Sequence, residues 1–425
     1  RISNSFVQAQ LVTDDASYNR INTYQTYASQ ADAALSDSSA GLASPLQGFF
    51  DSLNSLASTP TSSSTRQGVL YAAQTLSSTF NNLQSQLASL DSQIAGSTAT
   101  TVSQINAYAK QLAQLNTAIS QATAQGNGQA PNDLLDQRDQ LLRNIGSDIG
   151  ITSTSNADGS VNVFLGSGQA LVLGSNANSL SLQADAYGQK QDVVLNSGNS
   201  KSIITSQVSG GSLGGLLDAQ RELIDPAISQ LGKLAVTLAS AVNAQNAKGM
   251  DQYGQLGGAL FSVPPPAVTA SSANTGSGSV SASIADASQL SGSDYVLKYN
   301  GSGWSMTDAA SGASIALSGD GSAANPLTGA GLSIVTGGTP AAGDQFLVRP
   351  TYGAAGSIAV TTSDPGKVAA AAPVQVKAGG DIAAILGLCK HVLDKEDEAK
   401  ARGDSVLDHA FIRSHTHGFE AFVEK

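Results

Sequence analysis

Large apolar residues recur at alternating intervals of four and three positions over residues 76–94, and this spacing constrains the fold more than any other feature of the chain. The residues are Leu76, Phe80, Leu83, Leu87, Leu90 and Ile94. This alternation is the seam spacing of a coiled coil, in which one face of a long helix is continuously apolar. The segment therefore predicts a helix whose apolar stripe packs against other helices.

The same spacing continues beyond Gly96, and its later positions include Leu112, Leu115 and Ile119. One glycine inside a helix costs only about 1 kcal/mol relative to alanine. We therefore expect residues 66–124 to form a single helix, about 90 Å long at about 1.5 Å per residue. These three residues and the six of the preceding stripe form the predicted structural core of a helical stem.

The flanks of this stripe are polar but almost uncharged. Ser, Asn and Gln occupy the positions where soluble coiled coils usually carry Glu and Lys, and only 12% of the whole chain is charged. The usual share is about 25%. Ser, Thr, Ala, Asn, Gln and 44 glycines take the place of the charged residues, a composition common in secreted and surface-assembled proteins.

Charge and cysteine content argue against several classes of function. The net charge of −11 disfavours a nucleic-acid partner, which would require a basic surface, and it disfavours an anionic membrane surface. No apolar run approaches the roughly 20 residues of a membrane span. The single cysteine, Cys389, cannot form an internal disulfide, so an extracellular fold would depend on packing alone.

Apolar periodicity divides the chain into a helical stem and β-rich regions. The stem is predicted to be discontinuous, formed by residues 1–150 together with 209–250. Pro226 should cause a kink or a break near Asp225, because proline has no N–H to donate within a helix. Residues 151–208 alternate apolar and polar side chains between Asp-Gly and Gly-Ser turns, which predicts antiparallel β structure.

A second β-rich region is predicted over residues 262–375, with a hairpin that turns at Asn300-Gly301. We expect both β-rich regions to project from the stem. The predicted fold class is therefore multidomain α+β, with an elongated helical-bundle stem of long coiled-coil-like helices and two antiparallel β-rich outer domains. Residues 381–425 form an atypical charged tail, which holds 15 of the chain's 53 charged residues and all four histidines.

The segment GGSLG at residues 210–214 satisfies the G-x-S-x-G pattern of a hydrolase nucleophile. A secreted serine hydrolase that uses Ser212 is therefore one alternative function, although the histidines that could act as its base lie only in the tail. We favour a structural interpretation. In it, Gly210, Ser212 and Gly214 form the start of a helix, with Ser212 as the N-cap and the glycines permitting a tight turn.

No metal, cofactor or catalytic site is predicted elsewhere. His415 and His417 could share a metal ion, but two ligands do not complete a zinc site. The segment MDQYGQLGG places Asp251 and Gly254 as a calcium loop would, but the other oxygen ligands are missing. A solvated tail and a plain turn are the simpler interpretations.

Four stretches share features with one known family. They are RISNSFVQAQL, then GLASPLQGFFDSLNSLASTPTSSSTRQGVL, then LLDQRDQLL followed by VNVFLGSGQALVLG, and finally GGSLGGLLDAQRELIDPAISQLGKLA followed by NAQNAKGMDQYGQLGGALF. Together they span about residues 1–375 and resemble the flagellar hook-associated protein 1 family. The last pair of segments is the most specific. Residues 381–425 do not resemble the closing helices of that family.

The resemblance implies a structural junction protein of the bacterial flagellum, which connects the hook to the filament by packing of subunits. The expected partners are the hook protein, the second hook-associated protein and neighbouring copies of the chain, with an export chaperone before secretion. The expected location is the extracellular flagellum. The remaining alternative is another surface axial or adhesive protein.

Two further expectations concern assembly. The polar flanks of the helices should contact neighbouring subunits. The isolated chain should be a monomer, because its predicted stem surface offers no large apolar patch to hold a closed oligomer.

Overall fold

The computed structural model describes residues 5–36, 41–125, 131–166, 168–372, 394–395 and 397–403. Residues 1–371 form one compact unit, and residues 372–425 belong to a second. The helices that build the stem of the first unit are α1 (Ser5–Ser36), α2 (Ala43–Ser58), α3 (Ser63–Gln125), α4 (Asn132–Asp148), α5 (Gly211–Asp218) and α6 (Asp225–Asn246).

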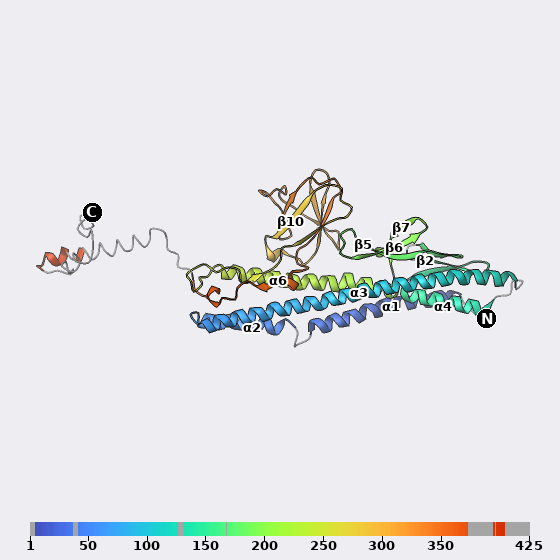
Figure 1. The fold of residues 1–425 in the computed structure, drawn as a ribbon, viewed down its shortest axis with the longest axis horizontal. Coiled ribbons are helices and arrows are strands. Elements are labelled where there is room, and N and C mark those ends of the chain that lie inside the picture. The colour runs from blue at the N-terminus through green and yellow to red at the C-terminus, as the bar shows by residue number, and fades with distance from the viewer. Residues whose placement is uncertain are drawn as a thin grey trace. The chain divides into compact units, whose positions relative to one another are not determined.

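Helix α3 is uninterrupted from Ser63 to Gln125, which confirms the single helix predicted for residues 66–124. It runs alongside the other stem helices in Figure 1 and contacts α1, α2, α4 and α6. At Gly96, no neighbouring heavy atom lies within 4 Å of the point that a Cβ would occupy. The glycine therefore neither interrupts the helix nor serves a close packing contact.

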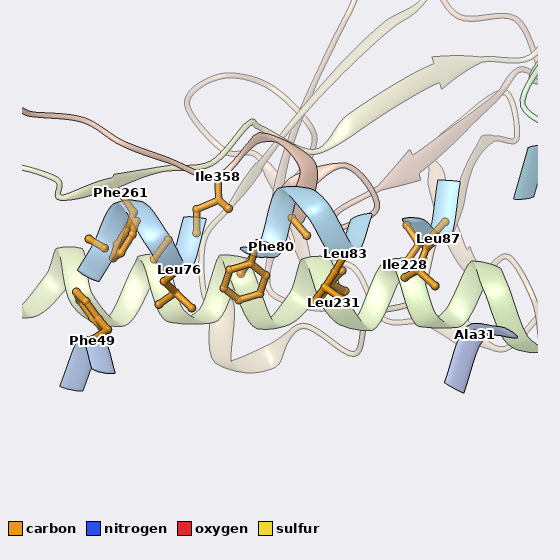
Figure 2. Close-up of a cluster of buried hydrophobic side chains, with 14 of the residues drawn as sticks. Ala31, Phe49, Leu76, Phe80, Leu83, Leu87, Ile228, Leu231, Phe261 and Ile358 are labelled. Carbon is orange, nitrogen blue, oxygen red and sulfur yellow. The ribbon is translucent and has the colours of Figure 1, made fainter. Parts of the chain in front are cut away.

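The apolar stripe of α3 lies in a core that the stem helices share. Figure 2 shows part of this core, with labels on Ala31, Phe49, Leu76, Phe80, Leu83, Leu87, Ile228, Leu231, Phe261 and Ile358. Leu90 and Ile94 belong to the same cluster, and Leu112 and Ile119 are buried further along the helix. Leu115 is only partly buried, and the inward position beside it is taken by the next residue of the helix.

Of the kink or break predicted near Asp225, the break does not occur, because the helical path continues through the region of Pro226. Helix α5 passes directly into a π-helical turn, η2 (Ala219–Ile224), and α6 begins at Asp225 with the proline in its first turn. Because the helical path is continuous here, Pro226 removes one N–H donor from it. The wider π-helical turn takes the place of the expected break.

Residues 151–208 form two antiparallel sheets, with strand orders β1-β2-β3-β4 and β5-β6-β7. The strands are β1 (Ile151–Ser155), β2 (Val161–Leu165), β3 (Gln169–Leu173), β4 (Asn176–Ala177), β5 (Ser179–Ala184), β6 (Gln191–Ser197) and β7 (Ser200–Ile203). A short 3₁₀ turn then leads to α5.

These two sheets lie against the stem and do not project from it. Their buried residues, such as Val163 and Val193, share one apolar cluster with Ile105 and Leu112 of α3. The expectation that residues 151–208 project as an outer domain is therefore wrong. Small sheets of three or four strands need a second layer to bury their apolar face, and α3 supplies it here.

The second β-rich region has a separate apolar cluster, which also includes Val236 of α6 and Ala354. It contains a three-stranded sheet, β10-β15-β14, and a five-stranded sheet, β13-β12-β11-β16-β9. The strands are β9 (Ala267–Ala270), β10 (Ser279–Ile284), β11 (Tyr295–Tyr299), β12 (Trp304–Asp308), β13 (Ser314–Ile315), β14 (Leu327–Gly329), β15 (Leu332–Gly337) and β16 (Gln345–Arg349). Strands β11 and β12 pair on either side of Asn300-Gly301, which confirms the predicted hairpin.

The chain returns to the stem well before residue 375, where the second β-rich region was predicted to end. Strand β8 (Phe261–Ser262) pairs with β17 (Ala359–Val360). Between β16 and β17, the short helix α7 (Ala354–Ser357) buries Ala355 in the stem core. We therefore use the name outer domain for residues 267–349 alone.

The predicted tail, residues 381–425, lies mostly outside the described residues, as do all four histidines and Cys389. In its described part, Lys395 Nζ lies 2.8 Å from Glu398 Oε2. This pair is three residues apart on one helical turn.

Candidate functional site

Asn116 on α3 is a polar side chain that is almost completely buried. Its Nδ2 donates to the carbonyl oxygens of Val161, at 2.8 Å, and Gly174, at 2.7 Å, and its Oδ1 accepts from the Val161 N–H at 3.0 Å. Val161 begins β2 and Gly174 follows β3. One side chain thus attaches two strands to α3 through their backbone, and its own polar atoms are satisfied.

Two other asparagines on stem helices act in the same way. Asn106 on α3 donates to the Leu180 carbonyl at 2.8 Å and accepts from the Leu180 N–H at 2.7 Å. Asn243 on α6 accepts from the N–H groups of Leu260 and Phe261 and donates to the Phe261 carbonyl. We use the name asparagine clamps for Asn106, Asn116 and Asn243.

The asparagine clamps were not predicted from the sequence. We expected the polar flanks of the helices to contact neighbouring subunits, whereas these three side chains bind segments of their own chain. The sequence did contain a signal for one of these three residues, Asn116. Asn116 lies four residues after Leu112 and three before Ile119, so it occupies a seam position, where a polar side chain must find partners.

The GGSLG segment does start a helix, but Ser212 does not cap it. Gly210, with φ of +68°, precedes α5, and no side chain caps the helix. Ser212 Oγ donates instead to the carbonyl of Ser147, at 3.2 Å. At Gly211, a Cβ would lie 2.3 Å from the carbonyl carbon of Asp148. The glycine is therefore required because α5 starts against the end of α4.

Gly214, which we predicted to be part of this helix start, makes no contact that a Cβ would disturb, since its nearest neighbour would be 3.6 Å away. The close contact occurs at Gly215, where a Cβ would lie 2.4 Å from the carbonyl oxygen of Arg20 on α1. Arg20 Nε also lies 2.5 Å from Asp218 Oδ2 on α5. These two contacts hold α1 against α5.

Asp148 is the last residue of α4 and lies beside the start of α5. Burial raises the pKa of its carboxyl from 3.8 to about 6. The charged form is disfavoured because a partly buried carboxylate loses hydration. This junction therefore contains a group that titrates close to neutral pH.

Helix α1 carries an apolar stripe that faces outward. Val7, Leu11, Tyr18 and Ile21 follow seam spacing, with Asp14 at the intervening position. All four apolar side chains are exposed, and Tyr18 and Ile21 are 67% and 65% exposed. The opposite face of α1 is packed into the stem. We call the four apolar residues the outer stripe, and their spacing suits contact with a further helix.

A cleft of about 500 Å³ adjoins the outer stripe at Ile21. Thr13 and Ser17 of α1 line one side, and Thr152 and Ser209 line the other. Within the described ranges, no helix is long and apolar enough to cross a membrane, and no three His, Cys, Asp or Glu side chains are grouped to hold a metal ion.

Comparison with known families accounts for both parts of this fold. Residues 28–261 match the family described as flagellar hook-associated protein FlgK helical domain, and residues 269–350 match flagellar hook-associated protein 1, D2-like domain. The first range covers most of the stem and its two sheets, and the second coincides with the outer domain. The fold is therefore that of a flagellar structural protein.

Individual relatives are similar over most of this chain. Flagellar hook-associated protein 1 of Escherichia coli (strain K12) is 33% identical over 81% of this chain and 63% of the relative. Its counterpart in Salmonella typhimurium is 32% identical over 86% of this chain and 67% of the relative. A solved structure of the flagellar hook junction protein FlgK from Burkholderia pseudomallei has a TM-score of 0.78 and 34% identity, and it covers 85% of this chain and 66% of that one.

The chain belongs to the flagellar hook-associated protein 1 family. This confirms the family resemblance found in the sequence and the predicted multidomain α+β fold. The chain spans about two thirds of the length of the relatives it matches.

Proposed function

We propose that this chain is a structural part of the junction between the flagellar hook and the filament, and that it acts by packing its stem against other subunits and not by catalysis. Its partners in this proposal are the hook protein, the second hook-associated protein and neighbouring copies of itself. Family membership supports the role. The observation that carries the mechanism is the outer stripe, an exposed apolar seam on a helix that is already packed on its other face.

The size of the outer stripe supports assembly in an array and not a stable isolated dimer. Burial of an apolar side chain contributes about 1.5–3 kcal/mol, so four partly exposed residues would contribute about 4–8 kcal/mol. Association costs about 4–15 kcal/mol in lost freedom of motion. The cost equals or exceeds the gain over most of these ranges, and we propose that the isolated chain is a monomer at micromolar concentration. Sedimentation that shows a stable dimer or ring would contradict this.

The proposal places the chain outside the cell, as part of the flagellum, after export with the help of a chaperone. A chain with sparse charge and a polar, Ser-rich and Asn-rich surface suits close packing among many subunits, because no helix is committed to one charged partner. Export requires no disulfide, and the single cysteine forms none within the chain.

Substitution of the outer stripe in the chromosomal gene tests the mechanism. Tyr18→Asp with Ile21→Asp should leave secretion intact but give hooks without filaments, because charge would be buried at the subunit contact. Leu173→Asp is the matched control, since Leu173 is an exposed apolar residue on β3 and not part of the outer stripe. Electron microscopy of cells and assay of the protein in the medium separate loss of assembly from loss of export. Normal filaments in the double variant would overturn the proposal.

A further inference from the structure

The turn between β5 and β6, residues 185–190, bonds to the outer domain on one side and to the stem on the other. Towards the outer domain, the carbonyl of Ala186 accepts from the N–H of Ser272 at 2.7 Å. The Tyr187 hydroxyl donates to Gln345 Oε1 at 3.3 Å. These contacts join a turn of the stem-bound sheet to the segment after β9 and to β16.

The opposite end of the turn is fixed to the stem by charge. Lys190 Nζ lies 2.5 Å from Asp225 Oδ1 at the start of α6 and 3.4 Å from Asp91 Oδ1 on α3. Gln220 Nε2 of the π-helical turn also donates to Asp91 Oδ1, at 2.8 Å. One lysine thus joins the turn to two helices of the stem.

Arg349, the last residue of β16, completes the connection. Its Nη1 donates to Gln189 Oε1 at 3.2 Å, and its Nε lies 2.9 Å from Asp294 Oδ2. Its guanidinium carbon also lies 3.1 Å from the centroid of the Tyr352 ring. The arginine therefore links the turn, the body of the outer domain and the segment that returns to the stem.

Because these charged groups are partly buried, loss of one of their contacts should cost more free energy than loss of a surface ion pair. Burial raises the pKa of Asp225 above its usual range even though Lys190 opposes the shift, so this partly buried carboxylate has lost some of its hydration. Burial likewise raises the pKa of Asp294, against the opposing charge of Arg349. Removal of the cation would leave a desolvated carboxylate without a partner, which costs more than loss of an exposed pair.

The outer domain is also packed on the stem, chiefly on α6. Two chain segments connect it to the stem, one of them through Pro264, Pro265 and Pro266. Its core includes Val236 of α6, and Gln230 of α6 donates to the carbonyl of Ser291 at 3.1 Å. A domain held on one helix can still rock about that helix, and a bonded turn on a second side restricts this motion.

We propose that residues 185–190 act as a strap that fixes the orientation of the outer domain relative to the stem. The strap has an outer-domain end, made by Tyr187 and Gln189, and a stem end, made by Lys190. The strap thereby fixes the outer domain relative to α3 and α6. Release of either end should leave both parts folded but allow the outer domain to move. This inference does not depend on where the protein assembles.

Distance measurement between spin labels on the full chain tests the strap. With Cys389 replaced by serine, labels at Thr100→Cys on α3 and Ser281→Cys on β10 report the orientation of the outer domain, since both positions are exposed. Lys190→Gln should broaden and shift the distance distribution. Lys201→Gln, the same change at an exposed lysine of β7, should leave the distribution unchanged.

A second variant protects the test against misfolding. Tyr187→Phe with Gln189→Ala removes the two side-chain contacts of the outer-domain end, while the bond from the Ala186 carbonyl, Lys190 and its carboxylate partners stay intact, and it should also broaden the distribution. Circular dichroism checks that each variant keeps its secondary structure. If a folded variant of either end retains the distribution of the parent chain, the strap does not set the orientation and the proposal is overturned.

Discussion

Replacement of Asn116 by alanine should destabilise the stem by about 2–4 kcal/mol, although alanine is the better helix former. The side chain makes three hydrogen bonds to β2 and to the residue after β3, and each contributes about 1 kcal/mol net. Backbone groups of Val161 and Gly174 that stay buried without a partner would add to the loss. The gain in helix propensity, about 0.5 kcal/mol, offsets only a small part of it.

Denaturant unfolding followed by circular dichroism measures this change, with Asn82→Ala as the control. Asn82 lies on the same helix but is exposed, so its replacement should stabilise the stem slightly, by about 0.5 kcal/mol or less. Hydrogen exchange gives a local measurement, since the Val161 N–H loses its acceptor only in the Asn116 variant. If the two variants change stability in the same direction and by similar amounts, Asn116 does not attach the sheet as we describe.

Four further predictions concern other parts of the fold. Leu87→Ala should cost about 2–5 kcal/mol, because Leu87 is fully buried in the stem core, and a loss below about 0.5 kcal/mol in denaturant unfolding would show that it is not core. Gly96→Ala should stabilise α3 by up to about 1 kcal/mol, because the added methyl meets open space, and a lower unfolding midpoint would contradict this. Asp148→Asn should stabilise the chain by about 1–2 kcal/mol near pH 7, after allowance for partial exposure, but not below pH 3.8. Because the pKa of Asp148 is raised in the folded chain, the stability that the protonated carboxyl contributes is present below pH 3.8 and is lost as the pH rises through about 6. An equal shift of the unfolding midpoint at pH 7 and below pH 3.8 would refute this prediction. Replacement of residues 267–349 by a short Gly-Ser linker should preserve cooperative unfolding of the stem, measured by calorimetry, and loss of that transition would show that the outer domain is not separable.

Helix α3 could be predicted from sequence because its information is local. A seam repeated over many turns leaves one conformation that buries all of its apolar residues, and the single Gly96 is too small a penalty to change the outcome. The hairpin at Asn300-Gly301 is local in the same sense, since the turn residues select the turn type. In both cases the segment itself contains the physical reason for its structure.

The attachment of the two sheets of residues 151–208 could not be predicted in this way. Periodicity shows that Ile105 and Leu112 face a partner, but it does not show whether that partner is a helix or a sheet. The same limit applies to Leu115 and Asn116, which are adjacent and compete for one inward position. Three hydrogen bonds to strands that are distant in sequence decide in favour of the asparagine.

The asparagine clamps form hydrogen bonds to backbone N–H and carbonyl groups, and these bonds do not involve the side chains of the segments they bind. A mutation that changes an outward-facing side chain of β2 or β3 therefore leaves the bonds from Asn116 in place. Such strands can therefore change their outward-facing side chains without loss of their attachment to α3. In a chain built in this way, the residues on the strand surface can change while the packing of the strands on the helix is retained.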